Sequence, residues 1–216
     1  MSCNYSINLY HAENNNMQTG NNNMQIENNN KTMDFRDYKS FFTHCKTGNL
    51  EAVKDCIENG ANINLNYDQA IKLAAKNGHV DVVTYLVKMG ADPNEALVDA
   101  AFNGHIIVVQ YLVLNGANVS ANNNAAIKYA SENGHIVVVQ YLVLNGVDPN
   151  EALVPAAENG QMNIIMFLVK HGINLDVHGQ DAIDMAKKNN HQYVVDYLTK
   201  IIFEIPIIDD SNQNMI

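Results

Sequence analysis

Apolar residues recur at helical spacing along most of this chain. Residues 80–88 carry valine and leucine at i, i+1, i+4 and i+5, which places these side chains on one face of an α-helix. The preceding segment, 67–76, has alanine at its apolar positions, and small side chains let neighbouring helices approach closely. The same two patterns alternate as far as residue 203. The sequence therefore predicts pairs of short helices.

A glycine lies in the turn between the two helices of most predicted pairs. The tripeptide Asn-Gly-His stands between the two helices at 77–79, 103–105 and 133–135, and altered copies stand at 47–49, 159–161 and 189–191. A second glycine, at residues 60, 90, 116, 146 and 172, provides the left-handed residue that ends a helix in the first five copies. A regular period of this length indicates repeats that bury one another's apolar faces. We expect an all-α solenoid of about six units over residues 34–203.

The repeat length alternates between 30 and 26 residues, and the difference lies in the connector after the second glycine. The short connectors have Asp-Pro-Asn-Glu at 92–95 and 148–151, which supplies an N-cap and a proline at the first helical position. The long connectors, as at 62–66, alternate polar and apolar residues. We expect each long connector to form a short extended finger.

Composition narrows the class of function. The 216-residue chain has a formal net charge of −10, which disfavours nucleic acid because phosphate binding requires a basic surface. Its three cysteines do not follow the repeat, so neither a disulfide framework nor a metal cluster is expected. No signal peptide or spanning segment is recognised. We expect a soluble, intracellular protein that does not bind membranes.

Both ends of the chain differ from the repeats. Residues 1–33 are rich in asparagine with few apolar groups, so we expect a disordered tail, to which no function is assigned. Residues 204–216 form a C-terminal tail. The apolar strip 201–208, interrupted by Pro206, is expected to fold over the last repeat or, alternatively, to dock on a partner.

With these features the array resembles the ankyrin repeat family over residues 34–203. The second half of the unit, from Gly78 to Asp92, has the form of an ordinary ankyrin repeat. The resemblance implies paired antiparallel helices, here with abbreviated or absent β-hairpins. It also implies a non-catalytic protein-binding scaffold without cofactors.

The first half of each unit departs from the family. The usual Thr-Pro-Leu-His is replaced by sequences such as that at 69–72, Gln-Ala-Ile-Lys, and the connectors are short. In these respects the chain resembles the Asn-rich, shortened ankyrin repeats of giant DNA viruses. That resemblance implies binding of host proteins in the host cytoplasm. The shortened connectors leave almost no hairpin tips for the binding mode that ankyrin repeats commonly use.

Metal binding and catalysis find little support in the sequence. His79, His105 and His135 recur once per unit, so they are expected to be spaced along the stack and to hydrogen-bond to backbone instead of meeting at one ion. A nucleophile and base would have to meet once, whereas the polar positions here repeat. We expect no catalytic, cofactor or metal-binding residues.

Two surfaces are candidates for protein binding. On the convex side, aliphatic residues replace the charged or polar residues of other units, which indicates a partner or dimer surface or, alternatively, ordinary exposed aliphatics. These residues are Ile107, Leu114, Val137 and Leu144. On the concave side, the freest positions precede each turn, and they include Lys76, Phe102 and Glu132. Phe102 is either an exposed anchor or partly buried against the next helix.

The predicted function is a protein-protein interaction scaffold. One alternative is an adaptor that recruits ubiquitination machinery, although no F-box-like segment is recognised, and a second is an enzyme. The oligomeric state is expected to be a monomer or weak dimer.

Overall fold

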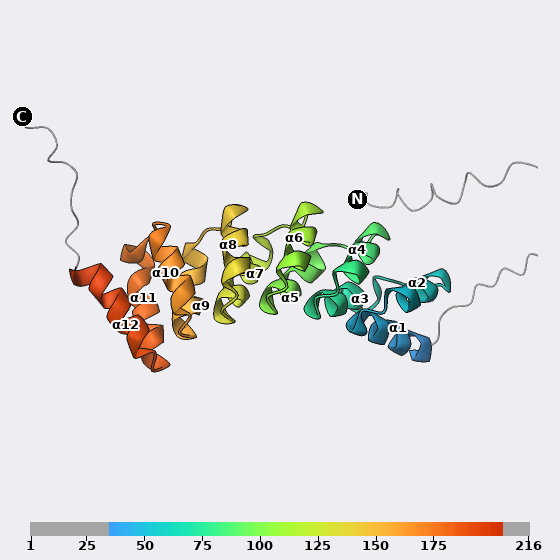
Figure 1. Ribbon diagram of the computed structural model, residues 1–216, viewed down its shortest axis with the longest axis horizontal. Coiled ribbons are helices and arrows are strands. Elements are labelled where there is room, and N and C mark those ends of the chain that lie inside the picture. The colour runs from blue at the N-terminus through green and yellow to red at the C-terminus, as the bar shows by residue number, and fades with distance from the viewer. Residues whose placement is uncertain (1–34, 205–216) are drawn as a thin grey trace, which may run out of the picture. The chain divides into compact units, whose positions relative to one another are not determined.

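The computed structural model describes residues 35–204, which form twelve α-helices and a final π-helical turn (Figure 1). The predicted N-terminal tail, 1–33, and all but the first residue of the predicted C-terminal tail lie outside the described residues. The helices are α1 Phe35–Thr47, α2 Leu50–Glu58, α3 Leu65–Lys76, α4 Val80–Lys88, α5 Asn94–Phe102, α6 Ile106–Leu114, α7 Ala121–Glu132, α8 Ile136–Leu144, α9 Asn150–Glu158, α10 Met162–Lys170, α11 Leu175–Lys188 and α12 Gln192–Thr199.

The helices pair as the sequence predicts. The odd-numbered inner helices contact one another in chain order, as do the even-numbered outer helices from α2 to α10, and each inner helix contacts the outer helix that follows it. The inner helices bury mainly alanine, for example Ala96, Ala100 and Ala101 in α5, whereas α6 buries Val108, Val109 and Leu112. No strand occurs within residues 35–204. The all-α repeat architecture is confirmed.

The turn histidines His79, His105 and His135 each join two units through the backbone. The glycine before each histidine has a positive φ, 77° at Gly78, which reverses the chain between the two helices. The ring Nε2 of His79 then lies 2.8 Å from the carbonyl oxygen of Lys46 in the preceding unit. Since a carbonyl accepts, the ring nitrogen donates. His105 and His135 make the same contact one and two units later, at 3.0 Å each, so the structural interpretation of these histidines is confirmed.

The short connectors begin their helices almost where predicted. Helix α5 begins at Asn94, one residue after the predicted Pro93, and the Asp92 carboxylate accepts a hydrogen bond from the Asn94 backbone N–H at 2.9 Å. Asp148 and Asn150 repeat this contact at the start of α9. The carboxylate therefore satisfies a backbone donor at the helix start.

The long connectors do not form the predicted extended fingers. In the first turn of α7, Asn122, Asn123 and Asn124 have φ values of 52°, 57° and 60°, in the left-handed region. Asparagine tolerates this region better than other non-glycine residues. At the start of α7 these asparagines coil the extra residues instead of letting them project. At the start of α3, Asn66 and Asp68 have positive φ, whereas no described residue does so at the start of α11.

The last described residues cover part of α11. Helix α12 continues into the π-helical turn Lys200–Glu204, where Ile202 packs on Gly179. A Cβ on Gly179 would lie 2.6 Å from Ile202 Cδ1, so the glycine makes room for this contact. The strip folds back as far as it is described, and its remainder lies outside the described residues.

Candidate functional site

One position per unit forms a row at the carboxyl ends of the inner helices. We call this the inner row, and its members are Lys46, Lys76, Phe102, Glu132 and Glu158. The turn histidine of each following unit donates a hydrogen bond to the backbone carbonyl of a row residue. The carbonyls of Lys46, Lys76 and Phe102 accept these bonds. Gln161 replaces histidine in its unit and donates to the Glu132 carbonyl at 3.0 Å. Side chains of the next unit therefore fix the backbone from which the row projects.

The charge of the inner row changes sign along the stack. Lys46 and Lys76 are exposed at one end, while Glu132 and Glu158 are half-buried at the other. Burial, and secondly the negative charge of Glu158, raise the pKa of the Glu132 carboxyl above its ordinary value. The two glutamates thus repel each other. A cation placed between them would relieve that repulsion.

Phe102 stands between the two charged ends. Its side chain is 43% exposed and meets Tyr129 of α7 edge-on, with ring centroids 5.8 Å apart and an interplanar angle of 68°. Edge-to-face contact is a favourable geometry for aromatic rings. Phe102 is therefore both exposed and packed against the next inner helix. Tyr129 was not among the predicted binding residues. The signal that could have identified it is that other units have Leu73, Asp99 or Pro155 at the equivalent position, none of them aromatic.

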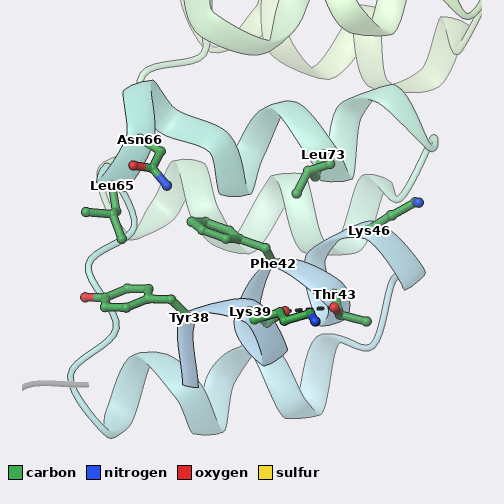
Figure 2. A pocket seen from close by; sticks show the side chains of 8 residues that line it. All are labelled: Tyr38, Lys39, Phe42, Thr43, Lys46, Leu65, Asn66 and Leu73. Carbon is green, nitrogen blue, oxygen red and sulfur yellow. Dashed lines mark hydrogen bonds between the residues drawn. The ribbon is translucent and has the colours of Figure 1, made fainter. Parts of the chain in front are cut away.

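A groove of about 450 Å³ lies beside the basic end of the row, between α1 and α3 (Figure 2). In Figure 2, Phe42 points from α1 toward α3, and Tyr38 and Leu65 lie together at the other end of the groove. Lys39 and Lys46 also line it. The groove combines an apolar lining with positive charge.

Two further grooves lie at equivalent positions farther along the chain. Two successive units together span 56 residues, so Tyr38, Asn94 and Asn150 occupy equivalent positions in the repeat. The second groove, of about 390 Å³, lies between α5 and α7 and is lined by Val98, Asp99 and Tyr129 among others. The third, of about 290 Å³, includes Val154, Pro155 and His178. Grooves thus recur at every second unit.

The alternating connectors explain this spacing. At each short junction a lysine and a glutamate join successive inner helices: Lys72 and Glu95 at 2.6 Å, and Lys128 and Glu151 at 2.8 Å. At each long junction the first residue of the new connector instead donates its backbone N–H to a side-chain oxygen of the preceding inner helix. These donor and acceptor pairs are Asn62 and Tyr38, Asn118 and Asn94, and Asn174 and Asn150. The grooves lie at the long junctions, and the ion-paired residues of the short junctions line the edges of the second and third grooves.

Asp99 in the second groove offers a test of its electrostatics. Burial raises the pKa of its carboxyl, while Lys76 and Lys72 oppose the rise. Because the folded pKa exceeds the unfolded one, stability falls as pH rises through the interval between them and stays lower above it. We expect Asp99→Asn to be more stable than wild type at pH 7, with the difference vanishing near about pH 3, below the ordinary aspartate pKa.

Urea denaturation at the two pH values measures this difference. Asp181→Asn, at an exposed position in the middle of α11, is the matched control, and we expect it to change stability little at either pH. An equal gain for Asp99→Asn at both pH values would contradict the electrostatic explanation.

The four aliphatic residues predicted on the opposite side are exposed. Ile107 and Leu114 on α6 are 59% and 80% exposed, and Val137 and Leu144 on α8 are 56% and 84% exposed. Helices α6 and α8 are in contact, so the four side chains belong to one surface. We call these four residues the outer patch. It lies on the outer helices, whereas the inner row and the grooves lie on the inner ones.

Metal-ligating groups, cysteine thiols and apolar helices bear on the other sequence predictions. No group of three His, Cys, Asp or Glu that could hold a metal ion occurs among the described residues. Cys45 and Cys56 are free thiols, and burial chiefly raises the pKa of Cys45 to about 12. A thiol in this state is a poor nucleophile at neutral pH. None of the helices in the described part of the chain is long and apolar enough to cross a membrane.

Comparisons with known proteins agree with this architecture. A family model described as "Ankyrin repeats (3 copies)" matches residues 9–96, 94–152 and 127–209. Among solved structures, the crystal structure of the human ASB11 ankyrin repeat domain is similar, with a TM-score of 0.66 and 22% sequence identity. That match covers 74% of this chain and 82% of the human domain, and at this identity it supports the fold alone. No curated protein matches the chain.

Proposed function

Because the chain belongs to the ankyrin repeat family, whose members generally bind other proteins, we propose that it is a non-catalytic scaffold that binds an extended segment of a partner protein along its inner helices. The observation that carries this proposal is the inner row, in which exposed Phe102 stands between a basic end and an acidic end. Aromatic residues at the centre of a surface are frequent binding anchors.

The order of charges along the row defines a direction for the bound segment. Acidic residues of the partner would lie over Lys46 and Lys76, and an apolar residue would contact Phe102. Basic residues would lie over Glu132 and Glu158, where they relieve the repulsion that raises the Glu132 pKa. Complementary charge of this kind favours one binding direction over the reverse.

The spacing of the grooves fits a ligand in extended conformation. Packed helices lie roughly 8–10 Å apart, so grooves two units apart are separated by about 16–20 Å. An extended chain rises about 3.3 Å per residue, and five or six residues cover that separation. The first groove, with its apolar lining and two lysines, suits an apolar side chain next to an acidic one. The partner would thus present anchor residues at this interval.

Two refinements of the proposal concern the partner. The resemblance to shortened viral ankyrin repeats favours a host protein as the ligand. If the scaffold instead recruits ubiquitination machinery, ligase subunits would be recovered together with it. An enzyme would be indicated by a hydrolase or transferase activity that depends on one polar residue.

Affinity purification from a eukaryotic lysate with mass spectrometry tests the proposal. The inner-row variant Lys76→Glu, Phe102→Ser, Glu132→Lys is compared with wild type and with the outer-patch variant Leu114→Ser, Leu144→Ser. All the substituted side chains are exposed or half-buried, so both variants are expected to fold, which thermal melts followed by circular dichroism would check. We expect the inner-row variant to lose its partners by about tenfold or more, because truncated anchors cost over 1 kcal/mol.

The outer-patch variant separates the two faces. We expect it to retain the partners of the wild type. Retention of all partners by the inner-row variant, or their loss from the outer-patch variant alone, would contradict binding along the inner helices.

A further inference from the structure

The outer patch lies on two nearly identical helices that carry no charge. Helix α6 reads IIVVQYLVL and α8 reads IVVVQYLVL, with no acidic or basic residue in either. At the equivalent positions the neighbouring outer helices carry Asp81 and Lys88 on α4, and Asn163 and Lys170 on α10. In a chain with a net charge of −10, this uncharged surface is where another acidic molecule can approach with least repulsion.

We infer that the outer patch binds a second copy of this chain, about a two-fold axis that runs along the stack of outer helices. Such an axis sets each outer helix antiparallel to its own copy, so α6 packs on α6 and α8 packs on α8. Ile107 then lies opposite Leu114 of the second copy, and Val137 opposite Leu144. The same contact is made twice, as a two-fold interface requires.

The polar residues within the patch fit this symmetry. Gln110 lies midway between Ile107 and Leu114, and Gln140 lies midway between Val137 and Leu144. Each glutamine would therefore face its own copy across the axis. An amide carries both donors and an acceptor, so two glutamines can pair with each other. A lone lysine or glutamate at this point would instead meet its own charge.

Two directions of the two-fold axis are possible, along the stack or parallel to the helices, and the charges on α4 distinguish them. In the antiparallel arrangement, Asp81 faces Lys88 of the second copy, and both such pairs attract. An axis parallel to the helices would place α4 over α10 of the second copy and bring Lys88 to Lys170. Like charges placed opposite each other oppose association. The charge pattern therefore favours the axis along the stack.

The size of the patch sets the expected strength. A nine-residue helix is about 13 Å long and packed helices lie about 10 Å apart, so two helices present a few hundred Å² on each copy. Stable interfaces bury about 1,200–2,000 Å² in total. We expect a weak dimer with a dissociation constant on the order of 0.1 mM. It would leave the inner helices free.

Cysteine cross-linking tests the axis directly. In a chain with Cys3 and Cys56 replaced by serine, Gln110→Cys is expected to form a disulfide-linked dimer on mild oxidation, because the axis brings the two sulfurs together. Lys76→Cys on the inner face, in the same background, is the matched control and should remain monomeric. Equal cross-linking of the two variants, or none by Gln110→Cys, would overturn the inference.

Sedimentation of the full chain at concentrations up to about 0.5 mM tests the pairing itself. Leu114→Glu with Leu144→Glu should abolish the dimer, and Asp81→Lys alone should weaken it roughly threefold or more through its two charge pairs. Restoring opposite charges with Asp81→Lys and Lys88→Asp together should recover wild-type dimerisation. A dimer that is insensitive to the leucine substitutions, or a double charge reversal weaker than either single one, would refute the proposed interface.

Discussion

Replacing Leu112 by alanine is expected to lower the free energy of unfolding by about 2–5 kcal/mol. The Leu112 side chain is fully buried in α6, where it packs between units. Its truncation leaves a cavity because close-packed neighbours relax only in part. Urea denaturation followed by helical circular dichroism measures the change.

Leu114 provides a control of the same residue type in the same helix. It is 80% exposed, so Leu114→Ala should change the free energy of unfolding by less than about 0.5 kcal/mol. The two substitutions differ chiefly in burial, because the change in helix propensity from leucine to alanine is small. Similar destabilisation by both would contradict the assignment of α6 faces.

Replacing Gly104 by alanine is expected to destabilise the protein by about 2–3 kcal/mol through two effects. Gly104 has a φ of 73°, which is strained for any residue with a Cβ. A Cβ there would also lie 2.5 Å from Nδ1 of His135. The displaced ring would lose its hydrogen bond to the Phe102 carbonyl. Thermal and urea denaturation would measure the combined effect.

Two further variants separate these effects. Gly116 has a φ of 95° but nothing within 4 Å of a Cβ, so Gly116→Ala should show the backbone strain alone, about 1–2 kcal/mol. Gly104→Ala combined with His135→Ala should be less destabilising than the sum of the single changes, because the clash is removed. Additive effects would mean that the ring accommodates the new methyl group without loss.

The same hydrogen bonds connect stability with the proposed binding surface. The carbonyl that His135 binds belongs to Phe102, the exposed aromatic of the inner row. The turn is thus the element that both joins successive units and positions the residue proposed to contact the partner. A change at Gly104 is expected to affect both properties.

The sequence determined most of the local structure. Periodicity placed α4 at Val80–Lys88 as predicted, and the repeat register identified the exposed residues of α6 and α8. It also assigned the turn histidines to backbone hydrogen bonds. These features follow from contacts within a helical turn or from a fixed repeat, both of which can be read from one chain. The candidate residues were identified in this way, and their binding remains a prediction.

Only the tertiary structure decided how successive inner helices are spaced. Left-handed asparagines coil the chain at the start of α7, where an extended finger was predicted, while Lys72 and Glu95 join the helices at a short junction. The grooves at every second unit lie at the long junctions. Alternation of polar and apolar residues carries no information about backbone torsion angles of this kind, and the distance between neighbouring units depends on those angles. The sequence thus determined which faces are apolar, and the connector geometry decided where the surface opens.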